Sequence, residues 1–153
     1  MLLQLKKVFD SPGQSLDIDV CVPVAELIEL RPYDTFAAPL NIKGSVKNRA
    51  GLVVLDMTVK AVLEQTCDRC LKAFEREYVC DFSHTLVTSF SNSEDEEGYE
   101  DYVVCPDNSL DISELALTDL MLEMPSKILC KEDCKGLCPK CGKDLNEGSC
   151  GCE

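Results

Sequence analysis

The sequence predicts an α+β protein in which a curved antiparallel β-sheet carries a C-terminal helix and a small zinc-ribbon-like tail. Three observations support this prediction. Apolar and polar residues alternate between positions 40 and 88, apolar residues recur at helical spacing between 111 and 124, and cysteines crowd the end of the chain. We therefore expect a β-rich body over residues 1–125 and a zinc-binding tail over residues 126–153 that packs on the body.

The first 35 residues contain short apolar runs. Leu2 to Phe9 and Leu16 to Val22 are candidates for short strands, and Val24 to Leu30 is long enough for one or two helical turns. The breaks between these runs fall at Pro12, Gly13, Pro23 and Pro32.

Residues 40–88 have the period-two pattern of half-buried antiparallel strands. The residues Asn48-Arg49-Ala50-Gly51 are expected to form a hairpin turn. The apolar positions of the three predicted strands are Leu40, Ile42 and Val46, then Val53, Leu55, Met57, Val59, Ala61 and Leu63, then Phe74, Tyr78, Cys80, Phe82 and Leu86.

The formal net charge of −13 is unevenly distributed. Residues 92–123 contain eleven acidic residues and no lysine or arginine, so a local acidic segment accompanies a body that is close to neutral. Within it, residues 91–101 lack apolar periodicity and are expected to form a mobile loop, after which Tyr102 to Cys105 could return as a short strand.

A helix is predicted to begin near Asp111. Glu114 follows this capping aspartate by three residues, and Pro125 ends the helix. Helical spacing connects Leu117, Leu120, Met121 and Met124.

Eleven cysteines form the most informative pattern in the sequence. Zinc takes four thiolates tetrahedrally, and a two-residue spacer lets one turn present two sulfurs to the same ion. Two groups of four can be drawn, and we expect one zinc ion in each. The first group is Cys67, Cys70, Cys130 and Cys134, and the second is Cys138, Cys141, Cys150 and Cys152.

Alternatives remain open for both groups. An iron–sulfur cluster also takes four thiolates. Cys130 and Cys134 could instead belong to the tail and compete for a single ion there. A thiol-redox role for Cys67 and Cys70 is the weaker interpretation, because no helix follows them in a β-α-β context.

The sequence offers no sign of catalysis. Zinc held by four protein ligands has no open position for water, and no phosphate loop or nucleophile motif is present. His84, the only histidine, falls on the apolar face of its strand and is expected to be a core residue. We see no secretory signal, no membrane span and no small-molecule site, so a cytoplasmic location is the default expectation.

Three motifs are distinctive in combination: Cys67-Asp-Arg-Cys70-Leu71 with Phe74, then Met124-Pro125, then the run from Cys130 through Cys138-Pro-Lys-Cys141-Gly to Asn146. Together they resemble the motifs of the YceD family, known as large-ribosomal-RNA (23S) accumulation proteins. It covers about residues 40–153. It implies a non-catalytic, zinc-binding factor in large ribosomal subunit biogenesis and 23S rRNA accumulation. It also implies that the first four cysteines form one site and the tail a second.

Charge sets two expectations for the partner. If ribosomal RNA of the large subunit is contacted directly, basic residues near the proposed metals should make the contact, because phosphate attracts lysine and arginine. The possible RNA contacts are Arg69, Lys72, Lys135, Lys140 and Lys143. An acidic protein suits a basic ribosomal protein better, and we favour a protein partner or a mixed protein–RNA partner.

A zinc-stabilised interaction adaptor unrelated to ribosomes is the alternative function, and an unrecognised nuclease or redox enzyme is a third.

Overall fold

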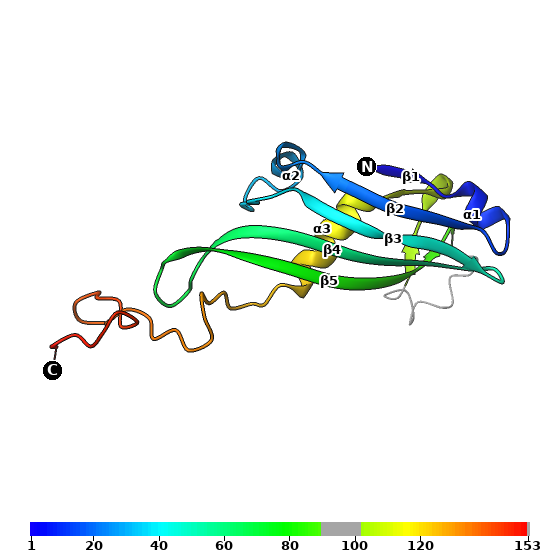
Figure 1. Ribbon diagram of the computed structural model, residues 1–153. Coiled ribbons are helices and arrows are strands. Elements are labelled where there is room, and N and C mark those ends of the chain that lie inside the picture. The colour runs from blue at the N-terminus through cyan, green and yellow to red at the C-terminus, as the bar shows by residue number, and fades with distance from the viewer. Residues whose placement is uncertain (90–101, 153) are drawn as a thin grey trace.

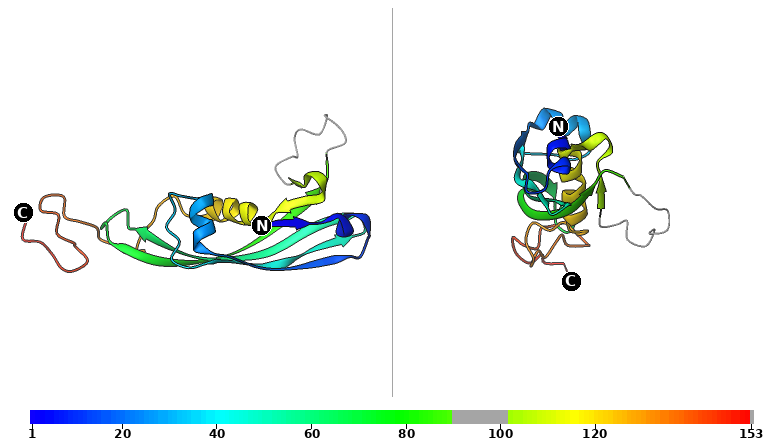
Figure 2. Two further views of the ribbon diagram at one scale, coloured as in Figure 1. Left: turned by 90° about the horizontal axis from the view of Figure 1, so that it is seen from above. Right: turned by 90° about the vertical axis from the view of Figure 1, so that its right-hand side faces the viewer.

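The computed structural model describes residues 1–89 and 102–152 and shows an elongated α+β molecule (Figures 1 and 2). The predicted fold class is confirmed. In chain order the elements are β1 (Leu2–Gln4), α1 (Lys6–Asp10), β2 (Ser15–Val22), α2 (Val24–Leu30), β3 (Leu40–Arg49), β4 (Leu52–Thr66), β5 (Ala73–Val87), β6 (Tyr102–Val104), the short 3-10 helix η2 (Pro106–Asn108), β7 (Ser109–Asp111) and α3 (Ile112–Glu123).

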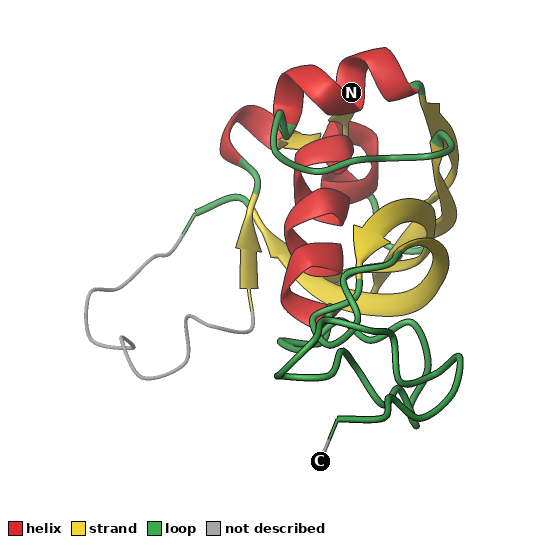
Figure 3. Cartoon of the chain, turned by 90° about the vertical axis from the view of Figure 1, so that its left-hand side faces the viewer, coloured by secondary structure: helices red, strands yellow, loops and turns green. Residues whose placement is uncertain are grey.

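A five-stranded sheet in the order β2-β3-β4-β5-β6 forms the body. Four strands are antiparallel neighbours, and β6 is added in parallel to the last residues of β5, from Thr85 to Val87. A small second sheet pairs β1 with β7. The main sheet curls, and α3 lies within the curve (Figure 3). The hairpin of β4 and β5 extends toward the C-terminal tail, which lies at one end of the molecule (Figure 2).

Strands β3 and β4 approach each other closely at Gly44 in β3. A Cβ atom at this position would lie 2.1 Å from the backbone oxygen of Asp56 in β4, closer than any side chain can approach. Only glycine allows this close approach of the two backbones.

The β3–β4 hairpin turn lies within the predicted segment. Arg49 pairs with Leu52, so Ala50 and Gly51 form a two-residue loop, and both have positive φ angles, 54° and 95°. The side-chain oxygen of Asn48 accepts a hydrogen bond of 2.8 Å from the Gly51 N–H. Buried Asn48 therefore closes the turn.

The core lies between the inner face of the sheet and α3. Alternate residues of β4, such as Leu55 and Val59, are fully buried, as the period-two pattern predicts. In α3, Leu117 and Leu120 are buried against them. The predicted capping role of Asp111 is confirmed, because its carboxylate accepts hydrogen bonds from the N–H groups of the second and third helical residues at 3.0 and 3.1 Å.

The amino terminus differs in part from the prediction. The strand expected from Leu2 to Phe9 ends at Gln4, and the rest of that segment is helix α1. Leu5 and Val8 are both buried, and their spacing of three places them on one side of a helical turn rather than on one face of a strand. The strand expected from Leu16 to Val22 is present as β2, Ser15–Val22, and the helical turns expected from Val24 to Leu30 are confirmed as α2.

The predicted acidic loop at residues 91–101 lies outside the described residues. The short strand expected after it is present as β6. In the part of the chain that the structure describes, no helix is long and apolar enough to cross a bilayer.

Candidate metal centres

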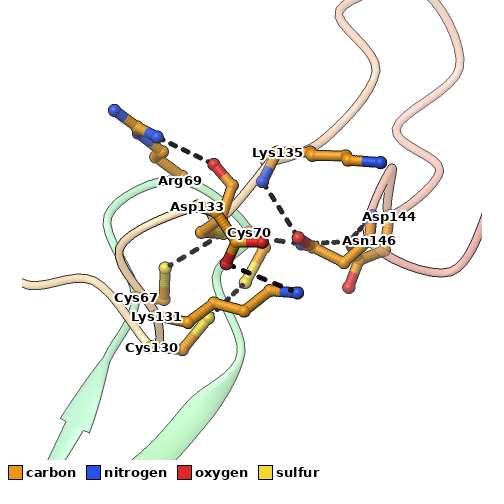
Figure 4. A network of polar contacts seen from close by, with 10 residues as sticks. Cys67, Arg69, Cys70, Cys130, Lys131, Asp133, Lys135, Asp144 and Asn146 are labelled. Atoms are coloured by element: carbon orange, nitrogen blue, oxygen red, sulfur yellow. Dashed lines mark hydrogen bonds and ion pairs between the residues drawn. The ribbon is translucent and has the colours of Figure 1, made fainter.

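The first cysteine group joins two distant parts of the chain. Cys67 and Cys70 lie in the loop between β4 and β5, and Cys130 and Cys134 lie in the segment that follows α3. The Cys67 and Cys134 sulfurs are 3.7 Å apart, as are those of Cys70 and Cys130 (Figure 4). All four sulfurs lie within 4.8 Å of one another, so the structure brings together the four residues of the first predicted group.

Polar contacts attach the segment after α3 to the β4–β5 loop. Asp68 and Ile128 exchange two hydrogen bonds, one between backbones at 2.8 Å and one from the Ile128 N–H to the Asp68 carboxylate at 2.6 Å. The Arg69 guanidinium donates to the backbone oxygen of Cys134 at 2.8 Å (Figure 4). Arg76 in β5 donates to the oxygen of Leu129 at 2.5 Å. These bonds fix Cys130 and Cys134 over the first pair of cysteines.

The second group is local to the tail. The sulfurs of Cys138, Cys141, Cys150 and Cys152 also lie within 4.8 Å of one another. Cys138 is buried, whereas Cys141 and Cys152 are exposed. The second group is therefore more open to solvent than the first, whose cysteines are buried or half-buried.

The two Cys-x-x-Cys turns share one backbone design. In the first, Leu71 N–H donates to Cys67 O at 2.9 Å, and Cys67 N–H donates to the oxygen of the fifth residue on at 3.0 Å. In the second, Gly142 N–H donates to Cys138 O, and Cys138 N–H donates to the oxygen of the fifth residue on, both at 2.8 Å. Leu71 and Gly142 occupy the same place with φ angles of 58° and 73°. A left-handed residue thus follows each pair, although leucine is strained there and glycine is not.

The two groups are linked by Asn146 and Gly136. The Asn146 side-chain amide donates to the Cys134 sulfur at 3.4 Å, and its oxygen accepts from the Lys135 N–H at 2.9 Å (Figure 4). Gly136 has a φ of 74°, and a Cβ there would lie 3.0 Å from the backbone oxygen of Arg69. Glycine therefore lets the tail pack against the first cysteine turn. Sequence reasoning assigned no role to either residue, and their only signal was their place in the family-like run.

Backbone N–H groups favour the thiolate form of one cysteine in each turn. Burial raises the pKa of Cys67, but hydrogen bonds from backbone N–H groups, that of Cys130 first, outweigh it and lower the pKa to about 6. The backbone N–H of Cys141 and then the Cys150 thiol lower the pKa of Cys138 to about 6. Burial raises the pKa of Cys130 to about 12. A metal ion that binds the first group must therefore displace a firmly held proton.

The geometry of the first group fits a single tetrahedral ion. Four sulfurs placed about 2.3 Å from a central zinc ion lie about 3.8 Å from one another, and the two measured separations are 3.7 Å. Clusters that contain several irons hold their cysteines around a larger body, so sulfurs this close favour one ion. An ion with four protein ligands has no free position for substrate, and such a centre supports structure rather than reaction.

The basic residues proposed for RNA contact have varied roles. Arg69 supports the carbonyl of a cysteine in the first group. Lys143 donates to the backbone oxygen of Ser149 at 3.2 Å. Lys72, Lys135 and Lys140 are exposed near the two groups.

His84 is half-buried and lies on the inner face of β5, opposite Leu55. Its ring nitrogen Nε2 is hydrogen-bonded to the carboxylate of Asp119 in α3 at 2.7 Å. The position of His84 on this face was predicted from the alternating pattern, whereas its partner Asp119 was not predicted. Cys80, on the same face, packs against the core, and burial raises the pKa of its thiol.

Comparisons with known proteins agree with the motif pattern. The family model described as "Large ribosomal RNA subunit accumulation protein YceD" matches residues 55–153. The uncharacterized protein YlbN of Bacillus subtilis is 28% identical over 134 residues, which cover 87% of this chain and 76% of that protein. The chloroplastic "Large ribosomal RNA subunit accumulation protein YCED homolog 1" of Zea mays is 27% identical over 143 residues, 75% of this chain but only 49% of that protein. No solved structure matches the chain.

Proposed function

The chain belongs to the YceD family, and from this membership we propose that it is a non-catalytic zinc-binding factor that supports accumulation of 23S rRNA and biogenesis of the large ribosomal subunit. The observation that carries the metal assignment is the first cysteine group, in which two sulfur–sulfur separations of 3.7 Å match the edge of a zinc–thiolate tetrahedron and all four sulfurs lie within 4.8 Å of one another. We assign one zinc ion to each group, and cytoplasm as the location.

Zinc has a structural role in this proposal. When bound, it neutralises thiolates and joins the β4–β5 loop to the segment after α3. The tail at residues 126–152 buries no aliphatic or aromatic side chain fully, so the metal must supply most of the energy that orders it. The protein then acts by binding, with the body and tail each presenting a fixed surface.

A basic ribosomal protein or a mixed protein–RNA surface suits the charge of −13 better than broad contact with a phosphate backbone. Exposed lysines near the metal centres remain the best candidates for local RNA contact. Lys135→Glu tests this better than a change at Arg69, because Arg69 supports the metal centre. Direct RNA contact predicts affinity that falls steeply with salt and falls again in Lys135→Glu.

Depletion of the protein from its own cells tests the function. We expect a smaller large-subunit peak in ribosome profiles and less 23S rRNA, both restored by the wild-type chain. Normal subunit peaks and normal 23S rRNA in depleted cells would refute the ribosomal role and favour an adaptor unrelated to ribosomes.

A further inference from the structure

Strand β5 has a long free edge. Its whole length from Ala73 to Leu86 pairs with β4 on one side. On the other side β6 pairs only with Thr85–Val87. Within the described residues, no backbone hydrogen bond reaches residues 73–84 from that other side. In Figure 1, β5 borders the sheet, and the connector to the tail (residues 124–129) runs below the half of β5 that leads to the β4–β5 loop.

The inner face beside this edge is incompletely covered. Tyr78, Cys80 and Phe82 point inward and pack on the core, yet each remains partly exposed. On the neighbouring helix α3, Leu122 is 81% exposed. The opposite edge of the sheet differs, because the inward residues of β2, such as Val20, are buried. The β5 edge therefore has room for the side chains of an additional strand, and the β2 edge does not.

The charge beside the edge is acidic. Glu75, Glu77 and Asp81 are exposed on the outer face of β5, where Glu77 is ion-paired with Lys60 of β4 at 2.7 Å. Burial first, and then the nearby charge of Glu123 in α3, raise the pKa of Cys80. Glu75 lies directly opposite Glu64 of β4, a like-charge pair that an added cation would relieve. Arg76 is the only lysine or arginine between positions 73 and 84, and its guanidinium already donates a hydrogen bond to the backbone oxygen of Leu129 in the connector to the tail.

Natural sheets protect free edges with lysine, proline or bulges. Residues 73–84 contain neither lysine nor proline. The acidic residues protect this edge only against a second copy of itself, because antiparallel pairing of two copies about the centre would set Glu75 of one opposite Asp81 of the other. The same residues attract a basic strand.

We propose that the free edge of β5, residues 77–84, binds an extended basic segment of a partner protein as an additional β-strand. Alternate residues of that segment are apolar and cover Tyr78, Phe82 and Leu122, and the others are lysine or arginine and face the acidic side chains. Main-chain hydrogen bonds to β5 hold the segment, and the charges select it. This mode of binding requires neither RNA contact nor the ribosomal role, and depletion experiments and peptide binding can therefore fail separately.

The test uses the full-length, zinc-loaded protein and a fluorescent twelve-residue peptide of alternating lysine and valine. We expect saturable binding by fluorescence polarisation and slower amide hydrogen exchange in residues 77–84. The double variant Glu77→Lys/Asp81→Lys should bind at least about tenfold more weakly. The matched control Asp17→Lys/Asp19→Lys, on exposed positions of edge strand β2, should bind like the wild type.

Two control peptides complete the test. A lysine–proline repeat has the same charge but cannot form the ladder, and a glutamate–valine repeat has the opposite charge. Neither should bind. Equal binding of the lysine–proline repeat, exchange protection located elsewhere, equal binding of the glutamate–valine repeat, or dimerisation of the protein through β5 would each overturn the proposal.

Discussion

Removal of metal should unfold the tail and leave the sheet intact. The perturbation is a chelator strong enough to strip zinc under non-denaturing conditions, applied to the full-length chain. Residues 126–152 bury only two cysteines and a glycine, Cys134, Cys138 and Gly136, and their aliphatic side chains, such as Leu129 and Leu137, are at most half-buried, which is too little to order the tail. The expected readouts are fast amide exchange throughout the tail and an almost unchanged far-UV circular dichroism spectrum.

The size of the zinc-binding free energy makes chelation a demanding test of the division between body and tail. A structural zinc ion contributes about 10–16 kcal/mol of binding free energy, as much as the entire stability of a typical domain, about 5–15 kcal/mol. If that energy also held the sheet, chelation would unfold the whole protein. The buried cluster of the body and the cysteine cluster share no residue, so we expect the loss to stay in the tail.

The thermal midpoint of the sheet provides the quantitative limit. About 1 kcal/mol shifts the midpoint of a domain of this size by about 2–4 °C, and we expect a shift no larger than that after chelation. As a matched control, Cys21→Ser changes an exposed cysteine outside both groups and should retain all metal. Cooperative loss of sheet and tail together would refute the division between body and tail.

Three further predictions concern the body, and urea denaturation measures each. His84→Leu should lower the free energy of unfolding by about 1–3 kcal/mol, because it leaves the buried carboxylate of Asp119 without its partner. Changing both residues to leucine should lower it less. A double variant that loses as much stability as the single one would contradict this. Gly44→Ala should cost about 3 kcal/mol, since its Cβ would lie 2.1 Å from the oxygen of Asp56, and a neutral result would mean that β3 is not held so close to β4. Asp111→Ala should cost about 1 kcal/mol by removing the cap of α3, whereas Asp111→Asn should keep most of the stability; equal losses would argue against capping.

Much of the fold could be predicted because its patterns are local. The period-two alternation in β4 continues without interruption, so it predicts both the strand and the face that Leu55 and Val59 bury. Asp111 and Glu114 indicate the start of α3 in the same local way. The secondary structure of the amino terminus was harder to predict, because two apolar positions, Leu5 and Val8, are too few to distinguish a helical turn from a strand.

The pairing of the cysteines was predictable to different degrees. Spacing alone points to the second group, because all its members lie within one short segment. The first group depends on contacts across some sixty residues, such as the bonds between Asp68 and Ile128, and these cannot be read from periodicity. Asn146 and the partner of His84 were missed for the same reason, since a side-chain hydrogen bond between distant elements leaves no pattern in the sequence.

Metal stoichiometry tests the central claim most directly. Elemental analysis of the full-length protein, purified without added metal, should give two zinc ions per chain. The variant Cys67→Ser/Cys70→Ser should give one, with the tail's ion retained, because its four sulfurs come together without the β4–β5 loop. One zinc ion in the wild-type protein, or iron with visible absorbance in place of zinc, would contradict the account.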